Sequence, residues 1–250
     1  MASVSVIIPF YKKHLFLKKA VESILSQTYK DFEIIIIHDD PKDQNLEFIN
    51  NIKSMDNRII VLKNKENLGA GFSRNEGIKI AKGNYIAFLD ADDVWYQNKL
   101  SVQIDFMKKN NFSLTYTNYE TFGKKMKKII NPPKLDYSNF IRNTSIATST
   151  MMVRRKEIKN IKFTNSKICE DYYFKCKLLK KVKSAYCLKK NLTKYRIRDK
   201  SLQSNNIRNF YWIWKINKDY NNLNFFENFI SLFFISLNSI KKYGGKNIFD

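Results

Sequence analysis

The sequence predicts an α/β protein built on a mostly parallel sheet that is flanked by helices. Apolar runs such as VSVIIPF (4–10) and FEIIIIH (32–38) lack a regular alternation of polar and apolar residues. Such runs are typical of strands buried on both faces. Segments with apolar residues at helical spacing separate them. The chain has 250 residues and is 44% hydrophobic, which is enough for a substantial core.

Strand and helix signals alternate through the first half of the chain. The expected strands are residues 3–10, 32–40, 58–64 and 84–93. The expected helices are residues 14–27, 43–54 and 71–82, and Gly83 is expected to end the last one at the C′ position. Asp43 is expected as a helix N-cap or turn residue. This order predicts parallel strands with helices on each side of the sheet.

The second half has a less regular pattern. It begins with an expected helix (97–109), a strand (112–119) and a hairpin around Gly123. A loop with a short helix (132–145), a strand (147–155), a helix (169–181) and two short strands within 183–198 follow. The chain is expected to be helical from Ile207 onward. We therefore expect one catalytic domain with a C-terminal helical extension.

The composition limits the kinds of partner and compartment that are expected. The 45 basic and 23 acidic residues give a formal net charge of +22, which favours an anionic partner, although lysines spread along the chain also fit a solubilising surface. Three cysteines without a C-x-x-C pair predict neither a disulfide framework nor a zinc knuckle. No secretory leader precedes the first strand, so we expect a cytoplasmic protein.

Acidic residues cluster where two expected strands end. Asp90, Asp92 and Asp93 fall within four positions directly after an apolar run, and Asp39 and Asp40 end another strand. Because parallel strands present their carboxyl ends at one edge, we expect both clusters to face one crevice. A divalent cation would relieve the repulsion between the carboxylates. Hard oxygen ligands suit Mn²⁺ or Mg²⁺ that bridges to a diphosphate.

The segment GAGFSR (69–74) is similar to a dinucleotide-binding fingerprint, but the match fails on mechanism. Arg74 replaces the third glycine, and the loop 64–68 separates the glycines from the preceding strand. A dehydrogenase would also have no use for Asp92 and Asp93. We therefore reject the dinucleotide-binding interpretation.

Taken together, four segments resemble the family 2 glycosyltransferases with the GT-A fold. They are VSVIIPFYKK (4–13), SQTYKDFEIIIIHDD (26–40), NLGAGFSRNEGIKIAKGNYIAFLDADDVW (67–95) and CEDYYF (169–174). The resemblance is dense over residues 3–100 and returns at 148–152, 170–171 and 195–204. It implies a GT-A catalytic domain over residues 1–205, with a nucleotide-binding half (about 1–100) and an acceptor half (about 101–205). Residues 206–250 are expected to form the helical extension.

The resemblance implies roles for residues that would hold the nucleotide sugar. Pro9 and Tyr11 would line the base pocket, and Asp39 would hydrogen-bond the base. The family usually has Asp-Asp-Gly-Ser where this chain has His-Asp-Asp-Pro (38–41). An alignment shifted by one residue would therefore assign the base to Asp40.

The resemblance also assigns the D-x-D pair and its neighbours. Asp92 would be the direct ligand of Mn²⁺ or Mg²⁺, and Asp90 would contact the ribose or complete the metal shell. Arg74 would pair with a carboxylate of the site or with phosphate. Arg196 and Arg198 would contact phosphate or acceptor, because an arginine fork matches phosphate oxygens. The alternative for these last two is a basic surface strand.

Asp171 resembles the general base of the family. An inverting transfer needs a carboxylate that takes the proton of the acceptor hydroxyl as this hydroxyl attacks the anomeric carbon. The alternative for Glu170 and Asp171 is a favourable position at a helix start. Glu170 lies about 100° around the helix from Asp171 and is expected to point elsewhere.

The tail 224–246 has an apolar helical stripe followed by two lysines. The stripe comprises Phe226, Phe229, Phe233, Leu237 and Ile240. It fits an interfacial helix on an anionic membrane. It also fits a helix packed on the catalytic domain or in a homodimer, and the breadth of the apolar face favours this second interpretation.

The leading hypothesis is an inverting, metal-dependent glycosyltransferase. It would move a sugar from a nucleotide-diphosphate donor, expected to be a UDP-sugar, to a hydroxyl of a glycan or lipid-linked acceptor in cell-envelope polysaccharide synthesis. We expect it in the cytoplasm, at the inner face of the plasma membrane if the tail binds lipid. A basic nucleic-acid-binding protein is an alternative, but no nucleic-acid-binding module appears. A sugar-nucleotide nucleotidyltransferase is another, but the first strand is followed by PFYKKH, which has no glycine.

Overall fold

The computed structural model describes residues 2–243 except 44, 124–125, 165–167 and 198–205. The strands are β1 (Val4–Phe10), β2 (Phe32–His38), β3 (Ile59–Lys63), β4 (Tyr85–Phe88), β5 (Val94–Trp95), β6 (Leu114–Gly123), β7 (Lys127–Ile129), β8 (Lys134–Asp136), β9 (Met152–Arg154) and β10 (Ser184–Ile197). The helices are α1 (His14–Leu25), α2 (Leu46–Ser54), α3 (Gly69–Ile80), α4 (Lys99–Lys109), α5 (Tyr137–Phe140), the 3-10 turn η1 (Thr148–Thr150), α6 (Arg155–Ile158), α7 (Glu170–Val182), α8 (Asn206–Asp219) and α9 (Phe225–Tyr243).

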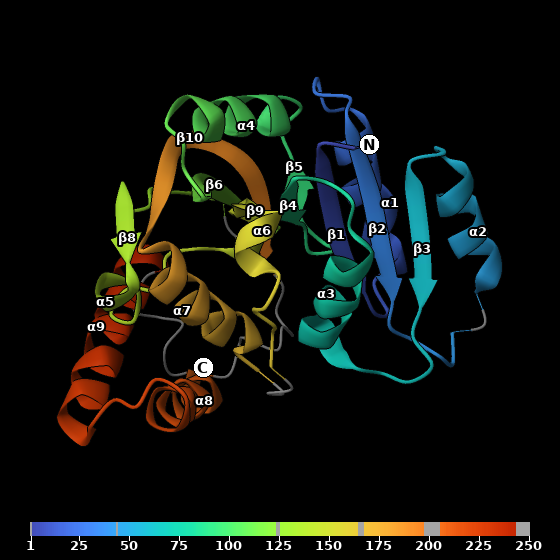
Figure 1. Ribbon diagram of the computed structural model, residues 1–250. Coiled ribbons are helices and arrows are strands. Elements are labelled where there is room, and N and C mark those ends of the chain that lie inside the picture. Colours follow the sequence, from blue (N-terminus) through green and yellow to red (C-terminus); the bar gives the residue numbers. More distant parts are fainter. Residues whose placement is uncertain (1, 44, 124–125, 165–167, 198–205, 244–250) are drawn as a thin grey trace.

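The strands of the described chain join into one sheet with the order β3-β2-β1-β4-β9-β6-β10-β5. The strands β3, β2, β1 and β4 are parallel neighbours. β9 lies antiparallel between β4 and β6, so β6 and its parallel neighbour β10 run in the same direction as β4. The predicted α/β class with a mostly parallel sheet is confirmed. β3 and α2 lie at one end of the molecule, and α8 and α9 lie at the other (Figure 1).

Both faces of the sheet are covered, which explains the apolar runs without alternation. Ile34 and Ile36 point to the face covered by α1, α2 and α4. Ile35 and Ile37 point to the opposite face and pack with residues of α7 and with Ile78 of α3. Because successive side chains of a strand point to opposite faces, every position of β2 is buried.

Three strand predictions are wrong in extent. β4 ends at Phe88, because the amide of Asp93 donates to the carbonyl of Asp90 at 2.9 Å and turns the acidic segment. Residues 184–197 form one strand, β10, rather than two, because β6 pairs along most of its length across two register shifts. Of the expected strand 147–155, residues 152–154 form the strand β9, since 148–150 form the turn η1.

Two helix boundaries also differ from the prediction. α3 ends at Ile80 and Ala81 is extended, so Gly83 does not cap the helix. Gly83 instead lets the chain approach β1, where an added Cβ would lie 2.5 Å from the Ser5 nitrogen. α2 begins at Leu46 and is capped by the side chain of Asn45. Asp43 is a turn residue that accepts the Asn45 amide hydrogen at 2.9 Å.

Lys99 is a fully buried lysine at the start of α4. Its ammonium lies 2.7 Å from Gln103 Oε1, to which it donates, and 4.0 Å from the centroid of the Trp95 ring. Burial lowers the pKa of Lys99 to about 7. The unfolded chain holds this proton to about pH 10. Between these two pKa values the unfolded state binds more protons than the folded state. The contribution of Lys99 to the free energy of unfolding therefore rises with pH in this range.

This pH dependence is measurable against a variant without the amine. Between about pH 7.5 and about pH 9.5, the free energy of unfolding of the wild type is expected to gain about 2–3 kcal/mol on that of Lys99→Met. Urea unfolding of both proteins at each pH measures the difference. The exposed Lys109 of the same helix supplies the control, since Lys109→Met should keep a constant difference. A constant difference for Lys99→Met would show that the buried amine stays charged.

Candidate active site

The carboxyl ends of β1, β2 and β4 lie at one edge of the sheet because these strands are parallel neighbours. Tyr11 follows β1, Asp39 and Asp40 follow β2, and the acidic segment 90–93 begins two residues after the end of β4. The structure therefore brings the predicted segments to the same edge. Ligands of open parallel sheets bind beyond this edge.

Arg74 of α3 links the acidic segment to the start of α7. Its guanidinium donates to Asp90 Oδ1 at 2.6 Å and to Glu170 Oε1 at 3.0 Å, and its side chain is 5% exposed. Burial opposes the charge of Arg74, but the two carboxylates raise its pKa above the ordinary value. Burial likewise opposes ionisation of Asp90, but Arg74 holds the pKa of that carboxyl below its usual range. Of the two expected partners of Arg74, the structure shows the carboxylates.

The expectation that Glu170 points away from the site is wrong. Glu170 is the first residue of α7, and its side chain reaches α3, where Gly71 leaves room for it. A Cβ added at Gly71 would lie 2.5 Å from Glu170 Cγ. The glycine of the GAG segment therefore serves a contact between α3 and α7. Burial and the neighbouring Asp171 raise the pKa of Glu170.

The other two carboxylates of the acidic segment also have partners. Asp92 Oδ1 accepts a hydrogen bond from the ammonium of Lys13 at 2.8 Å. Asp93 is buried and accepts from the Ser149 hydroxyl at 2.6 Å and from the Arg196 amide at 2.8 Å. Burial and the neighbouring Asp90 and Asp92 raise the pKa of Asp93 well above its usual range. Side-chain cations and neutral donors therefore relieve the repulsion that the sequence presents.

Asp171 is held by two neighbours at the start of α7. Its Oδ2 accepts from the Lys175 ammonium at 2.6 Å and from the Thr148 hydroxyl at 2.9 Å. Burial would raise the pKa of Asp171, but Lys175, Arg74 and the Thr148 hydroxyl lower it to about 2. Its side chain remains 24% exposed. An ionised, partly accessible carboxylate can accept a proton from a bound hydroxyl.

Asp39 is buried and caps the start of α3. Its Oδ1 accepts from the Asn64 side chain at 2.7 Å and from the Leu68 amide at 2.8 Å, and its Oδ2 accepts from the Gly69 amide at 2.8 Å. Gly69 has φ of +79°, a conformation that glycine adopts without strain. Asp40 is also buried and accepts from the Lys42 amide at 3.2 Å. A carboxylate has about four acceptor positions, so Asp39 retains the capacity to bind a base N–H.

The remaining predicted residues differ in their surroundings. Pro9 is half-buried in β1, whereas the Tyr11 side chain is 43% exposed and can stack on a ligand. Arg196 donates from Nε to the Asp92 carbonyl at 3.0 Å, and its guanidinium lies over the rings of Phe16 and Phe122 at 4.5 and 4.2 Å. Arg196 is therefore tied to the acidic segment. Arg198 lies outside the described residues.

A divalent cation fits the donor set only together with a ligand. Among the described residues, no group of three or more His, Cys, Asp or Glu side chains could hold a metal by itself. Mg²⁺ and Mn²⁺ sites that bind phosphorylated substrates need just one or two protein carboxylates, and the phosphates and water complete the shell. Asp92 can supply one such carboxylate, with Asp90 beside it.

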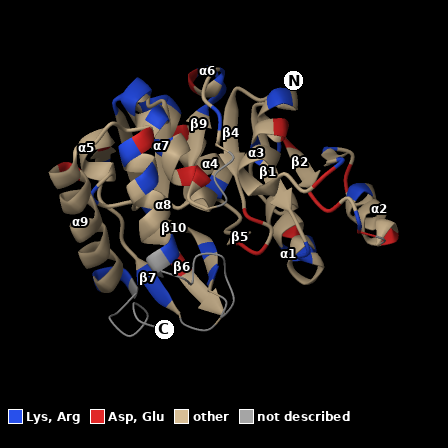
Figure 2. Cartoon of the chain, turned by 90° about the horizontal axis from the view of Figure 1, so that it is seen from below, with Lys and Arg blue, Asp and Glu red and all other residues tan. Residues whose placement is uncertain are grey.

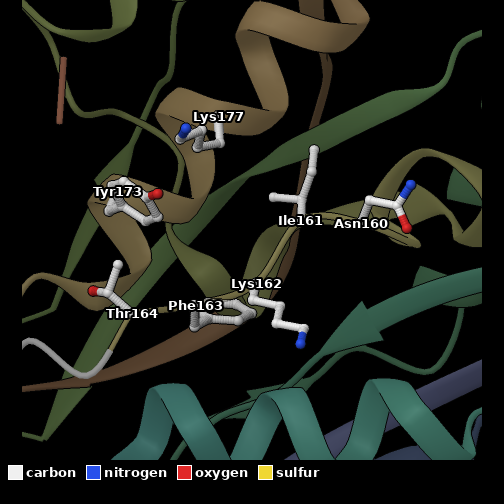
Figure 3. A pocket seen from close by; sticks show the side chains of 7 residues that line it. All are labelled: Asn160, Ile161, Lys162, Phe163, Thr164, Tyr173 and Lys177. Carbon is white, nitrogen blue, oxygen red and sulfur yellow. The ribbon is translucent and has the colours of Figure 1, made fainter.

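A pocket of about 280 Å³ lies beside α7, between the segment 160–164 and the helix (Figure 3). Tyr173 and Lys177 reach into it from α7, and Lys162 and Phe163 line it from the segment below. None of its lining residues was predicted as a site residue. The Asn75 side chain holds this segment by accepting from the Phe163 amide and donating to its carbonyl, both at 2.9 Å.

Four residues around the site were missed from the sequence: Lys13, Thr148, Ser149 and Lys175. Lys13 follows the first strand in PFYKKH, and a basic residue at the edge that carries the acidic clusters was a usable signal. Lys175 lies four residues after Asp171, so helical spacing could have paired them. Thr148 and Ser149 lie in an irregular segment without helical or strand periodicity, although the family resemblance returns at residues 148–152 and could have indicated them.

The sheet, the acidic segment at its carboxyl edge and the carboxylate pair at the start of α7 define the class of GT-A transferases that use nucleotide sugars. The model of Glycosyl transferase family 2 matches residues 5–173. The chain is 34% identical over 254 residues to the UDP-Glc:alpha-D-GlcNAc-diphosphoundecaprenol beta-1,3-glucosyltransferase WfgD of Escherichia coli, with 99% of this chain and 96% of WfgD covered.

Solved structures show the same fold at low sequence identity. Residues 1–349 of TarS from S. aureus, in complex with UDP-GlcNAc, superpose with a TM-score of 0.72 at 19% identity, over 96% of this chain and 73% of that one. The mannosyltransferase PcManGT of Pyrobaculum calidifontis, in complex with GDP-Man and Mn²⁺, has a TM-score of 0.70 at 13% identity, over 98% of this chain and 72% of that one. The chain therefore belongs to glycosyltransferase family 2 and is a glycosyltransferase with the GT-A fold. Neither a nucleic-acid-binding protein nor a nucleotidyltransferase fits this membership.

Proposed function

We propose that the protein transfers a sugar, with inversion, from a UDP-sugar to a hydroxyl of a glycan or lipid-linked acceptor in cell-envelope polysaccharide synthesis. The main support for this proposal is the pair of hydrogen bonds from Arg74 to Asp90 and Glu170, which we call the Arg74 bridge. One guanidinium binds Asp90 of the donor side and Glu170 at the start of α7. It thereby places Asp171, the adjacent residue, within electrostatic reach of the D-x-D segment. A base and a diphosphate site in one crevice are the minimum set for this reaction.

The proposed roles follow from the contacts. The Asp171 carboxylate takes the proton of the acceptor hydroxyl while that oxygen forms a bond to the anomeric carbon. The bond from this carbon to the diphosphate oxygen breaks on the opposite face, and the nucleoside diphosphate leaves as an anion. Lys175 and Thr148 hold the carboxylate of Asp171 in place. A bound Mn²⁺ or Mg²⁺, held by Asp92 with Asp90, would neutralise charge on the leaving diphosphate.

The donor side is assigned to the first half of the chain. Residues 1–100 would bind the nucleotide through Pro9, Tyr11 and Asp39, with Asp40 as the alternative contact for the base. Residues 101–205 would form the acceptor half, with residues 206–250 as a helical extension. Arg196 and Arg198 would contact phosphate or acceptor. The UDP-sugar donor and lipid-linked acceptor in the name of WfgD support this choice of substrates. A lipid-linked acceptor also supports a place at a membrane surface, which would be the cytoplasmic face of the plasma membrane.

A nucleotide titration tests the donor assignment. In the presence of Mn²⁺ we expect UDP to bind at least about tenfold more tightly than GDP or ADP. A pocket whose polar groups hydrogen-bond uracil leaves them unpaired when another base binds. Asp39→Ala should weaken UDP binding more than Asp40→Ala does, as measured by calorimetry on variants with matched thermal unfolding. The opposite order would assign the base contact to Asp40. Tighter binding of GDP would replace the UDP-sugar with a GDP-sugar, as in the complex of PcManGT.

A further inference from the structure

The helix α9 exposes apolar residues on its outer side, whereas a helix packed on a core usually exposes polar residues there. Eight of its apolar residues are 40% exposed or more, and we call them the α9 apolar face: Phe225, Phe226, Phe229, Ile230, Phe233, Phe234, Leu237 and Ile240. At about 100° per residue they fall within about half of the circumference of the helix. A helix that only covers a core turns such a face inward. This face is instead turned away from the protein.

The inward side of α9 buries Ile235 in the core and is also held by polar contacts. Asn228 Nδ2 donates to the Trp214 carbonyl at 3.0 Å. Ser231 is buried and its hydroxyl donates to the Ile141 carbonyl at 2.5 Å. Further along, the Asn238 side chain donates to the Arg142 carbonyl at 3.0 Å. These hydrogen bonds fix the rotation of the helix, because a turn about its axis would break all of them. The outward orientation of the phenylalanines is therefore specified by the fold.

Basic residues lie at the end of the α9 apolar face. The ammonium of Lys127 donates to the Lys241 carbonyl at 3.2 Å, which places β7 beside the last turn of α9. Lys127, Lys128 and Lys241 are exposed, and Met126 and Ile130 beside them are 82% and 78% exposed. Figure 2 shows α9 without basic residues along most of its length and with blue at the end near β7. Apart from Glu227 in its first turn, α9 carries no acidic residue.

We propose that the α9 apolar face rests on an anionic lipid membrane. Its phenylalanines would enter the boundary between headgroups and acyl chains, and the lysines at its end would contact acidic headgroups. A second copy of the chain is a poorer occupant, because two molecules that each carry a formal net charge of +22 repel one another. No helix among the described residues is long and apolar enough to cross a membrane. The proposal concerns where the enzyme binds and does not depend on which sugar it transfers.

Co-sedimentation of the full chain with vesicles tests the proposal. We expect binding to vesicles that contain phosphatidylglycerol and much weaker binding to pure phosphatidylcholine. The double variant Phe229→Gln with Phe233→Gln should bind the anionic vesicles at least about tenfold more weakly, because it removes two exposed aromatic rings from the face. The matched control is Leu15→Gln on α1, which changes an apolar residue that is 87% exposed on another element. This control should bind like the wild type.

A charge variant separates the two contributions. Lys128→Gln with Lys241→Gln should weaken binding to anionic vesicles by about fivefold per lysine and leave the residual binding to neutral vesicles unchanged. Transfer to a water-soluble acceptor should stay at the wild-type level in every variant, so a loss of vesicle binding is distinguishable from a failure of the enzyme. The proposal is overturned if the wild type does not sediment with anionic vesicles. It is also overturned if the phenylalanine variant dissolves a dimer seen by analytical ultracentrifugation and leaves vesicle binding unchanged.

Discussion

Replacing Asp92 with alanine is expected to reduce sugar transfer by at least about 10³-fold, because a metal that neutralises a leaving diphosphate contributes several kcal/mol to the transition state. Asp92 is the D-x-D carboxylate paired with Lys13, whose side chain is 26% exposed. Asp90 is instead bound to the buried Arg74. Binding of UDP in Mn²⁺ should weaken together with transfer, since a bound ion would join the protein to the diphosphate.

The fold of the Asp92→Ala variant should persist. The Lys13 partner is 26% exposed and can be solvated once Asp92 is lost, so we expect this loss to cost on the order of 1 kcal/mol and thermal unfolding to shift little. The exposed carboxylate of Asp105 on α4 supplies the matched control, and Asp105→Ala should retain wild-type turnover. Turnover is measured with a UDP-sugar in Mn²⁺ and again in excess chelator. Full activity of Asp92→Ala, or full activity of the wild type in chelator, would rule out the metal assignment.

Asp171→Asn is expected to lower turnover by a factor on the order of 10²–10⁴ and to leave UDP affinity near the wild-type value. Asparagine keeps the size of the side chain and still accepts hydrogen bonds from Lys175 and Thr148, but it cannot take the acceptor proton. With a pKa of about 2, Asp171 is ionised near neutral pH. Loss of activity near neutral pH therefore reports loss of the base rather than a shifted titration.

Glu170→Gln is the informative partner of Asp171→Asn. The glutamine oxygen can still accept from Arg74, but the charge of the pair is lost. We therefore expect a smaller fall in turnover than for Asp171→Asn. The two variants are compared by UDP affinity and by turnover. If Glu170→Gln is the inactive protein, the base is Glu170. If Asp171→Asn loses UDP affinity in step with turnover, Asp171 holds the donor or the metal and the proposed reaction lacks its base.

The acidic segment shows how a cluster of carboxylates is kept stable in this fold. Arg74 compensates Asp90, Lys13 compensates Asp92, and Asp93 has neutral donors and a raised pKa. The sequence suggested one divalent cation for this task. In the structure several side chains compensate the carboxylates instead. Lys13, the partner of Asp92, is more exposed than Arg74, the partner of Asp90. Each charge of the segment is therefore paired or hydrogen-bonded, as buried charges require.

The order of the elements in the first half of the chain and the class of the fold were predictable from the sequence, because both depend on local periodicity. Four consecutive isoleucines at 34–37 need apolar partners on both faces of a sheet, and they have them. Alternation of such runs with helical segments predicts parallel strands, and parallel strands bring their carboxyl ends to one edge. The ordered motifs over residues 4–95 and 169–174 added the family, which the comparison with the family model confirms.

The sequence by itself thus determined the sheet, the edge that carries the site and the acidic residues placed there. Only the tertiary structure decided which charges meet, since Arg74 and Glu170 are 96 residues apart and Lys13 and Asp92 are 79 apart. It also decided that Gly71 makes room for Glu170 and that α9 turns its phenylalanines outward. The physical reason is that hydrophobic periodicity reports which faces of an element are apolar. The partner of a charged side chain, and the direction an apolar face takes, depend on how elements far apart in the chain pack together.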